Sequence, residues 1–134
     1  MKQFALDDRL NADTFPVMSL GLCDLRLMND QRWPWLILIP RRPDLTELFD
    51  LTPLDQTMLT FESDMVAKAL KNVTGCDKIN TGALGNIVRQ LHCHVIARNE
   101  GDAGWPGPVW GHGVRVTYSE SDAQSLIGKI RNAL

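Results

Sequence analysis

The feature that most constrains the fold is a long helical segment with a clear start and a clear end. Thr52 is a favourable N-cap residue, and Pro53 suits the first helical position, where its missing N–H needs no partner. Gly75 suits the left-handed position that ends many helices. Between them, apolar residues recur at helical spacing: Leu54, Met58, Phe61, Met65, Ala69 and Leu70. The sequence therefore predicts one long helix between Thr52 and Gly75.

Strand-like segments precede this helix. Residues 19–28 carry leucines in a near-alternating pattern, which is typical of a half-buried strand. Residues 33–39 form an apolar run that ends at Pro40, which is typical of a buried strand. Residues 29–32 have the composition of a turn. The two segments therefore predict an antiparallel hairpin.

The remaining elements are shorter. Residues 13–16 are expected to interrupt an initial helix. The other expected elements are a helix over 3–12, strands near 76–80, 89–98 and 113–118, and a last helix capped by Ser119 or Ser121. This order predicts an α+β fold on an antiparallel sheet, with one long helix and a C-terminal helix. No repeat or linker divides the chain, so we expect a single domain over residues 1–134.

Composition and charge narrow the classes of function. The 14 basic and 16 acidic residues give a net charge of −2, which argues against an electrostatic nucleic-acid binder. The longest apolar run, residues 33–40, is too short to span a membrane, and the first residues lack the apolar core of a secretory signal. The cysteines are odd in number and show no paired spacing: Cys23, Cys76 and Cys93. They are interpreted as reduced thiols of a cytoplasmic protein that has no nucleic-acid or membrane partner.

The residues with the clearest chemistry lie between 80 and 98. Two of the chain's three histidines, His92 and His94, stand two residues apart in this stretch. If the stretch is a strand, its side chains alternate, so Gln90, His92 and His94 share one face. The opposite, core-facing side then carries Leu91, Cys93 and Val95. Two imidazoles and an amide in a row can line one small polar ligand.

A glycine-containing loop leads into this segment. Gly82, Gly85 and Asn86 lie just upstream, and glycines let a backbone approach an anion and present its N–H groups.

A metal site is a rival use of the two histidines, because two histidines on one strand face are a good start for zinc or iron. Its third ligand would be His112 or a carboxylate beyond the strand. The residues alone leave open a polar ligand site, a metal site and two ordinary strand histidines.

Several motifs resemble one known family. Residues 90–96 read Gln-Leu-His-Cys-His-Val-Ile and resemble the signature of the histidine triad (HIT) family, His-φ-His-φ-His-φ-φ with φ apolar. Residues 85–88 stand where that family has a Gly-polar-x-Val tetrad, and Arg98 follows the last histidine at the spacing of one branch. Residues 36–43 resemble the family's strand that ends in Val/Ile-Pro and basic residues. The resemblance extends over about residues 19–110.

This resemblance implies an HIT-like fold and a set of residue roles. His92 corresponds to the family's nucleophile, and His94 to the histidine that contacts phosphate and assists the leaving group. Gln90 replaces the first histidine of the triad, and an amide forms hydrogen bonds but cannot carry a proton charge. The residues expected to bind phosphate are Gln90, Asn86 and Gly85.

The resemblance also implies partners. Asn29 sits near the family position that bonds the ribose hydroxyls, although an ordinary turn residue is an equal interpretation. Asn80 resembles an Asn that precedes the loop in one branch, and it is the second expected nucleoside contact. A homodimer is expected. Trp105 and Trp110 lie in a Pro/Gly loop that either reaches the partner subunit's site or folds back onto its own domain.

The implied activity is hydrolysis of a nucleotide phosphoanhydride, phosphoramidate or ester through a nucleotidyl-histidine, with no cofactor and no metal. Nucleotidyl transfer is the alternative within the enzymes. A non-catalytic nucleotide-binding module is the second class of hypothesis. A metal protein on His92, His94 and His112 is the third.

Overall fold

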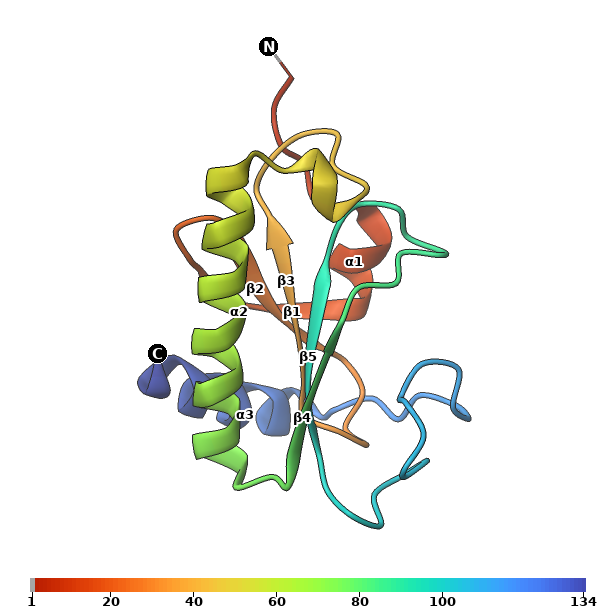
Figure 1. Cartoon of the computed structure of the whole chain (residues 1–134). Helices are drawn as coiled ribbons and strands as arrows, with labels where there is room; N and C mark the ends of the chain where they lie inside the picture. Colours follow the sequence, from red (N-terminus) through yellow and green to blue (C-terminus); the bar gives the residue numbers. More distant parts are fainter. Residues whose placement is uncertain (1) are drawn as a thin grey trace.

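Five antiparallel strands form one sheet in the computed structural model, which describes residues 2–134 (Figure 1). Their order across the sheet is β1-β2-β3-β5-β4. The strands are β1 (Thr14–Ser19), β2 (Cys23–Met28), β3 (Trp35–Pro40), β4 (Lys78–Gly82) and β5 (Cys93–Arg98). The helices are α1 (Asp8–Asp13), the 3-10 helix η1 (Leu48–Asp50), α2 (Pro53–Thr74) and α3 (Glu120–Ala133). The predicted α+β fold on an antiparallel sheet is confirmed.

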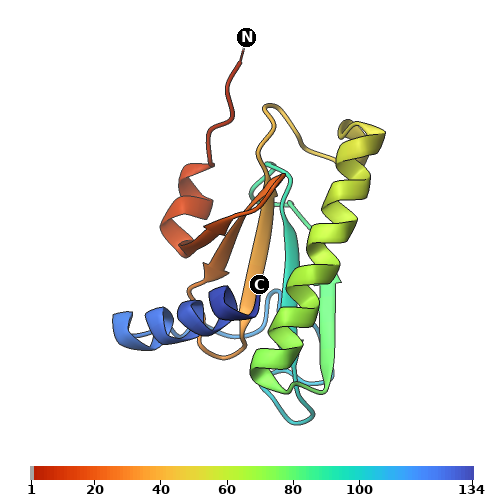
Figure 2. The same ribbon diagram turned by 90° about the vertical axis from the view of Figure 1, so that its left-hand side faces the viewer.

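Both faces of the sheet are covered, and this explains the continuous apolar run of β3. Leu36 and Leu38 face the main core under α2 and α3, whereas Ile37 and Ile39 belong to a second core against α1. α1 and α2 accordingly lie on opposite sides of the sheet (Figure 2). None of the helices within residues 2–134 is both long enough and apolar enough to cross a bilayer.

The long helix forms as its end signals predict. The Thr52 hydroxyl accepts a hydrogen bond from the N–H of Asp55 at 3.2 Å, which satisfies a donor that the first helical turn leaves free. Gly75 ends the helix with a φ of 65° in the left-handed region.

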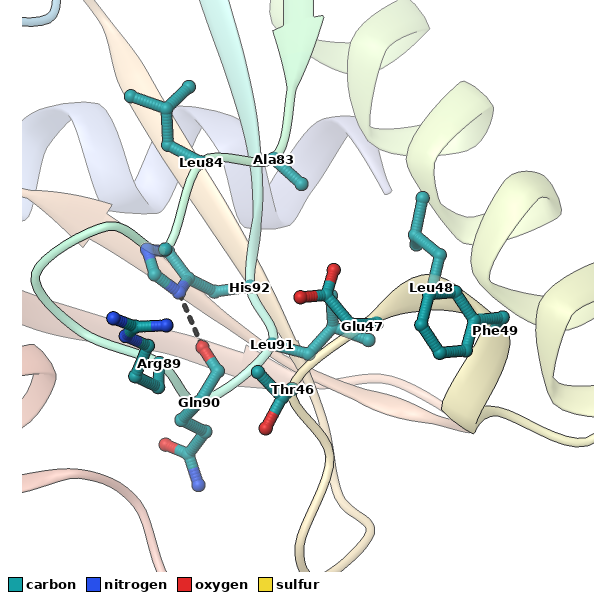
Figure 3. Close-up of a pocket in the computed structure, with 11 residues that line it drawn as sticks. Thr46, Glu47, Leu48, Phe49, Ala83, Leu84, Arg89, Gln90, Leu91 and His92 are labelled. Atoms are coloured by element: carbon teal, nitrogen blue, oxygen red, sulfur yellow. Dashed lines mark hydrogen bonds between the residues drawn. The ribbon is translucent and has the colours of Figure 1, made fainter.

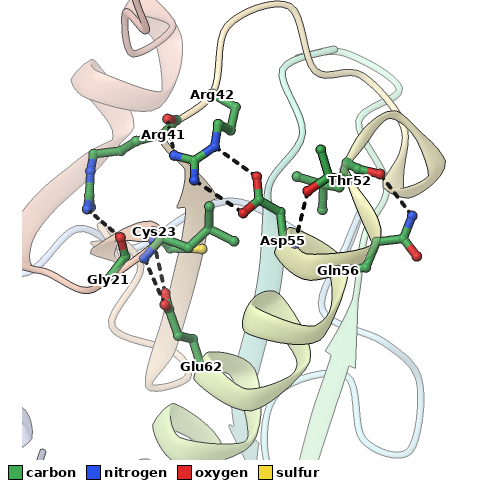
Figure 4. A network of polar contacts seen from close by, with 10 residues as sticks. Gly21, Cys23, Arg41, Arg42, Thr52, Asp55, Gln56 and Glu62 are labelled. Carbon is green, nitrogen blue, oxygen red and sulfur yellow. Dashed lines mark hydrogen bonds and ion pairs between the residues drawn. The ribbon is translucent and has the colours of Figure 1, made fainter.

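Two polar contacts fix α2 against the hairpin of β2 and β3 (Figure 4). The buried carboxylate of Glu62 accepts the N–H groups of Leu22 and Cys23 at 2.8 and 2.9 Å. Asp55 pairs with Arg42 at 2.8 Å. Arg42, at the end of the family-like strand, therefore links β3 to the start of α2.

The hairpin of β2 with β3 and the last helix, which Ser119 caps, are also confirmed. Other boundaries were predicted wrongly. Of the expected interruption at residues 13–16, Asp13 ends α1 and the rest belongs to β1, whose Val17 is completely buried against the main core. Residues 113–118 do not form a strand. The first helix is confined to Asp8–Asp13, and residues 2–7 run without regular structure.

Candidate active site

A cavity of about 450 Å³ lies on the face of the sheet that carries α1. His92, His94 and the loop before β5 form its floor, and α1 and the loop after β5 form its rim. A second cavity of about 230 Å³, next to η1, also touches His92 (Figure 3). The structure thus brings both predicted catalytic histidines to one cavity, with their ring centroids 4.9 Å apart.

The backbone fixes the tautomer of His92. The imidazole Nδ1 lies 2.7 Å from the carbonyl oxygen of Gln90, and the second ring nitrogen points away from that carbonyl (Figure 3). A carbonyl only accepts hydrogen bonds, so Nδ1 carries the proton and Nε2 keeps its lone pair. This is the protonation state that an imidazole nucleophile requires.

His94 is held by a different partner. Its Nδ1 accepts a hydrogen bond from the indole Nε1 of Trp35 at 2.9 Å. Burial, and then the neighbouring His92, lower the pKa of His94 to about 3. His94 is therefore neutral at ordinary pH. Trp35 was not among the predicted site residues. It lies on β3, which pairs with β5, the strand that carries His94.

The loop before β5 comes close to the histidines because of one glycine. Gly85 has a φ of 73°, and a Cβ there would lie 3.2 Å from the carbonyl oxygen of Val88. Gly85 and Asn86 line the main cavity together with both histidines. Two of the three predicted phosphate contacts are therefore in place beside the predicted nucleophile.

The third predicted phosphate contact is not placed this way. The Gln90 side chain turns to the N-terminal segment, where its Oε1 accepts the N–H of Asp7 and its Nε2 donates to the carbonyl of Ala5, both at 2.8 Å. The prediction of one row of Gln90, His92 and His94 is wrong at Gln90, because the backbone of Ala5 and Asp7 binds its amide. The amide is consequently engaged by the protein's own backbone.

Neither predicted nucleoside contact lines the main cavity. Asn29 Oδ1 accepts the N–H of Tyr118 at 2.8 Å, and Asn80 Oδ1 accepts a hydrogen bond from Arg98 at 3.3 Å. Both asparagines therefore support the fold. Asp30, the next residue in the same turn, does line the cavity, although it was not predicted as a site residue.

Arg98, which is 1% exposed, organises the loop after β5. Its guanidinium contacts both carboxylate oxygens of Asp102, at 2.8 and 2.7 Å, and donates to the carbonyl of Gly107 at 2.8 Å. It also lies 5.7 Å from the ring centroid of Trp33 and 5.5 Å from that of Trp105. The hydrogen bond from Arg98 lowers the pKa of Asp102, which favours the carboxylate form that the guanidinium binds.

This loop folds back onto its own chain and reaches its own site. The ring centroid of Trp110 lies 5.2 Å from that of His94, edge to face. A Cβ at Gly82 would come within 3.1 Å of this indole, so the glycine makes room for it. The Trp110 Nε1 is buried without a hydrogen-bond partner among residues 2–134. Of the two interpretations of the Trp105–Trp110 loop, packing on its own domain is the one that this chain displays.

A metal site on the three histidines does not form in the part of the chain that the structure describes. Residues 2–134 contain no group of three His, Cys, Asp or Glu side chains placed to hold an ion. His112 packs instead against the ring of Trp33, with the centroids 6.1 Å apart.

Comparison with known proteins defines the class. The model of the HIT domain family matches residues 9–101, and the chain belongs to this family. A histidine triad protein from Sinorhizobium meliloti 1021 is 60% identical over 98% of this chain and 97% of its own, with a TM-score of 0.96. One from Marinobacter aquaeolei VT8 is 44% identical over 99% of this chain and 97% of its own, with a TM-score of 0.97. A search of curated proteins finds no match.

The residues that match the family model, 9–101, cover only part of the cavity lining. They include the loop at Gly85 and both histidines of the floor, and they end at residue 101, before Trp105 and Trp110. The family resemblance carried by residues 85–98 is confirmed. The part of the rim that follows β5 lies outside the matched residues.

Proposed function

We propose that this protein hydrolyses a nucleotide phosphoanhydride, phosphoramidate or ester through a nucleotidyl-histidine on His92. One observation carries the proposal: the Gln90 carbonyl holds the Nδ1 proton of His92, so that Nε2 retains its lone pair in a ring that lines the cavity. Membership of a nucleotide-binding family supports a nucleotide as the ligand.

The reaction proceeds in two displacements. The Nε2 lone pair of His92 attacks the α-phosphorus, a P–N bond forms, and the bond to the leaving group breaks with its electron pair. The ring is now cationic, and its Nδ1–H remains bonded to the Gln90 carbonyl. Water then attacks the same phosphorus, the P–N bond returns its electron pair to Nε2, and one proton passes to solvent.

Donors around the floor suit the charge on the phosphoryl group. Nucleotidyl transfer depends mainly on positioning and on hydrogen bonds to the non-bridging oxygens. The Asn86 amide, the backbone N–H groups near Gly85 and the Nε2–H of His94 belong to the same cavity as His92. We propose that these groups donate to the phosphate.

The upper part of the cavity suits a nucleoside. Leu10, Met28 and Val109 offer apolar surface for a base. The three cysteines are free, which favours a reducing compartment such as the cytoplasm.

The test is to trap the intermediate. The protein is mixed with dinucleoside polyphosphates, aminoacyl adenylates and nucleoside phosphoramidates, quenched within the first turnover and analysed by mass spectrometry. A nucleotidyl adduct on His92 that water discharges supports hydrolysis. An adduct that only a second acceptor discharges indicates a nucleotidyltransferase, and tight binding with neither adduct nor turnover indicates a binding module.

We also propose a homodimer formed through the exposed face of α2. Leu54 and Phe61, seven residues apart and so on one helix face, are 71% and 64% exposed. Phe49 of η1 is also exposed, and β4 at the sheet edge has no outer partner strand among residues 2–134. Light scattering should give about twice the 15.0 kDa chain mass. Phe61→Lys should yield the monomer, and a parent that is monomeric at micromolar concentration would contradict the proposal.

A further inference from the structure

The contact between Trp35 and His94 determines where the His94 proton is. The indole nitrogen of Trp35 can only donate, so the His94 Nδ1 that it contacts at 2.9 Å is an unprotonated acceptor. A neutral imidazole carries one proton, and in His94 that proton is therefore on Nε2. Both side chains are buried, at 8% and 4% exposure, so water does not compete for this hydrogen bond.

A second proton on His94 is opposed by everything around it. Protonated Nδ1 would place two N–H donors against each other across the Trp35 contact. The other rings beside His94 are those of His92 and Trp110, and neither supplies a negative charge. The carboxylates of the cavity, Asp13 and Asp30, are already paired with arginines: Arg9, Arg115 and Arg32. The low pKa of His94 agrees with this geometry.

We propose that Trp35 is a positioning residue that fixes His94 as a neutral Nε2–H donor, and that this restricts the substrate to leaving groups that depart as stable anions. The proposal rests on the function proposed above, because it concerns the same attack by His92. It assigns His94 to binding a phosphate oxygen and not to protonating the leaving group.

The restriction follows from the fate of the electron pair. When a phosphoanhydride or acyl phosphate reacts, the P–O bond breaks and the pair stays on a phosphate or carboxylate oxygen, which needs no proton in that step. When a phosphoramidate reacts, the pair would stay on a strongly basic amide nitrogen unless an acid protonates it. Neutral His94 could supply that proton only by becoming an imidazolate. Phosphoanhydrides and acyl phosphates are therefore the expected class, ahead of phosphoramidates and alkyl esters.

The tautomer is tested on the ligand-free protein by histidine ¹⁵N NMR between pH 8 and 5. Parent, Trp35→Phe and Trp33→Phe are compared; the Trp33 indole donates to the carbonyl of Ala103 at 2.9 Å and so loses an equivalent bond away from the two histidines. In the parent and in Trp33→Phe, His94 should keep an unprotonated Nδ1 throughout. In Trp35→Phe, which removes the donor but keeps His94 buried, His94 should populate both neutral tautomers. A protonated Nδ1 in the parent, or titration near neutrality, overturns the proposal.

The leaving-group restriction is tested with ADP and adenosine 5′-phosphoramidate on the same three proteins. The parent and Trp33→Phe should prefer ADP by at least about a hundredfold in kcat/KM, the usual contribution of a general acid. Trp35→Phe should narrow this ratio by lowering kcat/KM for ADP, because only part of its His94 side chains keep the Nε2–H donor. Equal turnover of both substrates by the parent overturns the restriction. If the parent turns over neither, the function proposed above fails, and the NMR result still decides whether Trp35 fixes His94.

Discussion

The floor of the main cavity and its rim are held together in different ways. On the floor, His92 is fixed by a backbone carbonyl and His94 by an indole N–H, and both rings are nearly buried. On the rim, Asp13 of α1 pairs with Arg9 at 3.7 Å and with Arg115 of the loop after β5 at 3.1 Å. These side chains are between 31% and 61% exposed, and such pairs contribute only about 0–1 kcal/mol each.

The difference assigns chemistry and selectivity to separate regions. The two histidines of the floor are each oriented by one buried hydrogen bond, and both lie within the residues that match the HIT domain family. The rim combines α1 with a loop beyond those residues, and the exposed ion pairs that join the two can change without disturbing the histidines. We therefore expect floor substitutions to affect turnover or folding strongly, and rim substitutions to affect mainly KM.

The largest effect is expected at the nucleophile. His92→Asn should retain the fold and lose at least about a thousandfold in kcat, or about 4 kcal/mol of barrier, because an amide cannot form the P–N bond. Steady-state kinetics with circular dichroism as the folding control measures both. Near-full activity in this variant would remove His92 from the mechanism.

A large effect on stability is expected from the arginine that supports the loop beyond β5. Arg98→Met leaves Asp102 and the Gly107 carbonyl without their partner, and breaking a buried ion pair typically costs about 3 kcal/mol or more. The matched rim variant Arg9→Met removes an exposed pair and should change the unfolding free energy by less than about 0.5 kcal/mol. Urea denaturation compares the two, and similar losses would contradict the distinction between buried and exposed ion pairs.

An intermediate effect is expected at Gln90, which links the floor to the rim. Gln90→Leu removes two hydrogen bonds to the segment that leads into α1, and each is worth about 1 kcal/mol. Hydrogen exchange over residues 4–13 should accelerate, and KM should rise several-fold while kcat changes little. The exposed Gln124→Leu on α3 is the control. Unchanged exchange in Gln90→Leu would show that this amide does not hold the segment.

The smallest effect is expected on the rim itself. Arg115→Ala should leave stability within about 0.5 kcal/mol of the parent, because its pair with Asp13 is exposed. It should change KM by a few-fold and leave kcat unaltered. Kinetics at two salt concentrations isolates the electrostatic part, and a large fall in kcat would place Arg115 in the chemistry.

The elements with local signals were predicted well from the sequence. The long helix carries its own caps at Thr52 and Gly75, and the buried strand that ends at Pro40 carries its own apolar run. The two histidines of the cavity floor were singled out by a motif of contiguous residues. In each case, the information lies within one segment of the chain.

The misses concern contacts between distant segments. The strand alternation drawn through Gln90 failed because residues 5–7 provide the partners of its amide. Residues 113–118 are held as an irregular segment by the turn after β2, where the Gln31 N–H donates to the Val116 carbonyl at 2.7 Å. The contact of Trp35 with His94 depends on the pairing of β3 with β5, which the sequence does not show. No local pattern contains these pairings.

The central claim, a covalent intermediate on His92, is tested most directly by stereochemistry at phosphorus. A nucleotide substrate made chiral at the α-phosphorus with sulfur is hydrolysed in ¹⁸O-labelled water, and the configuration of the product is determined. Two successive in-line displacements each invert the phosphorus, so attack by His92 followed by attack of water predicts net retention of configuration. Net inversion would show that water attacks the substrate directly, and it would contradict the account.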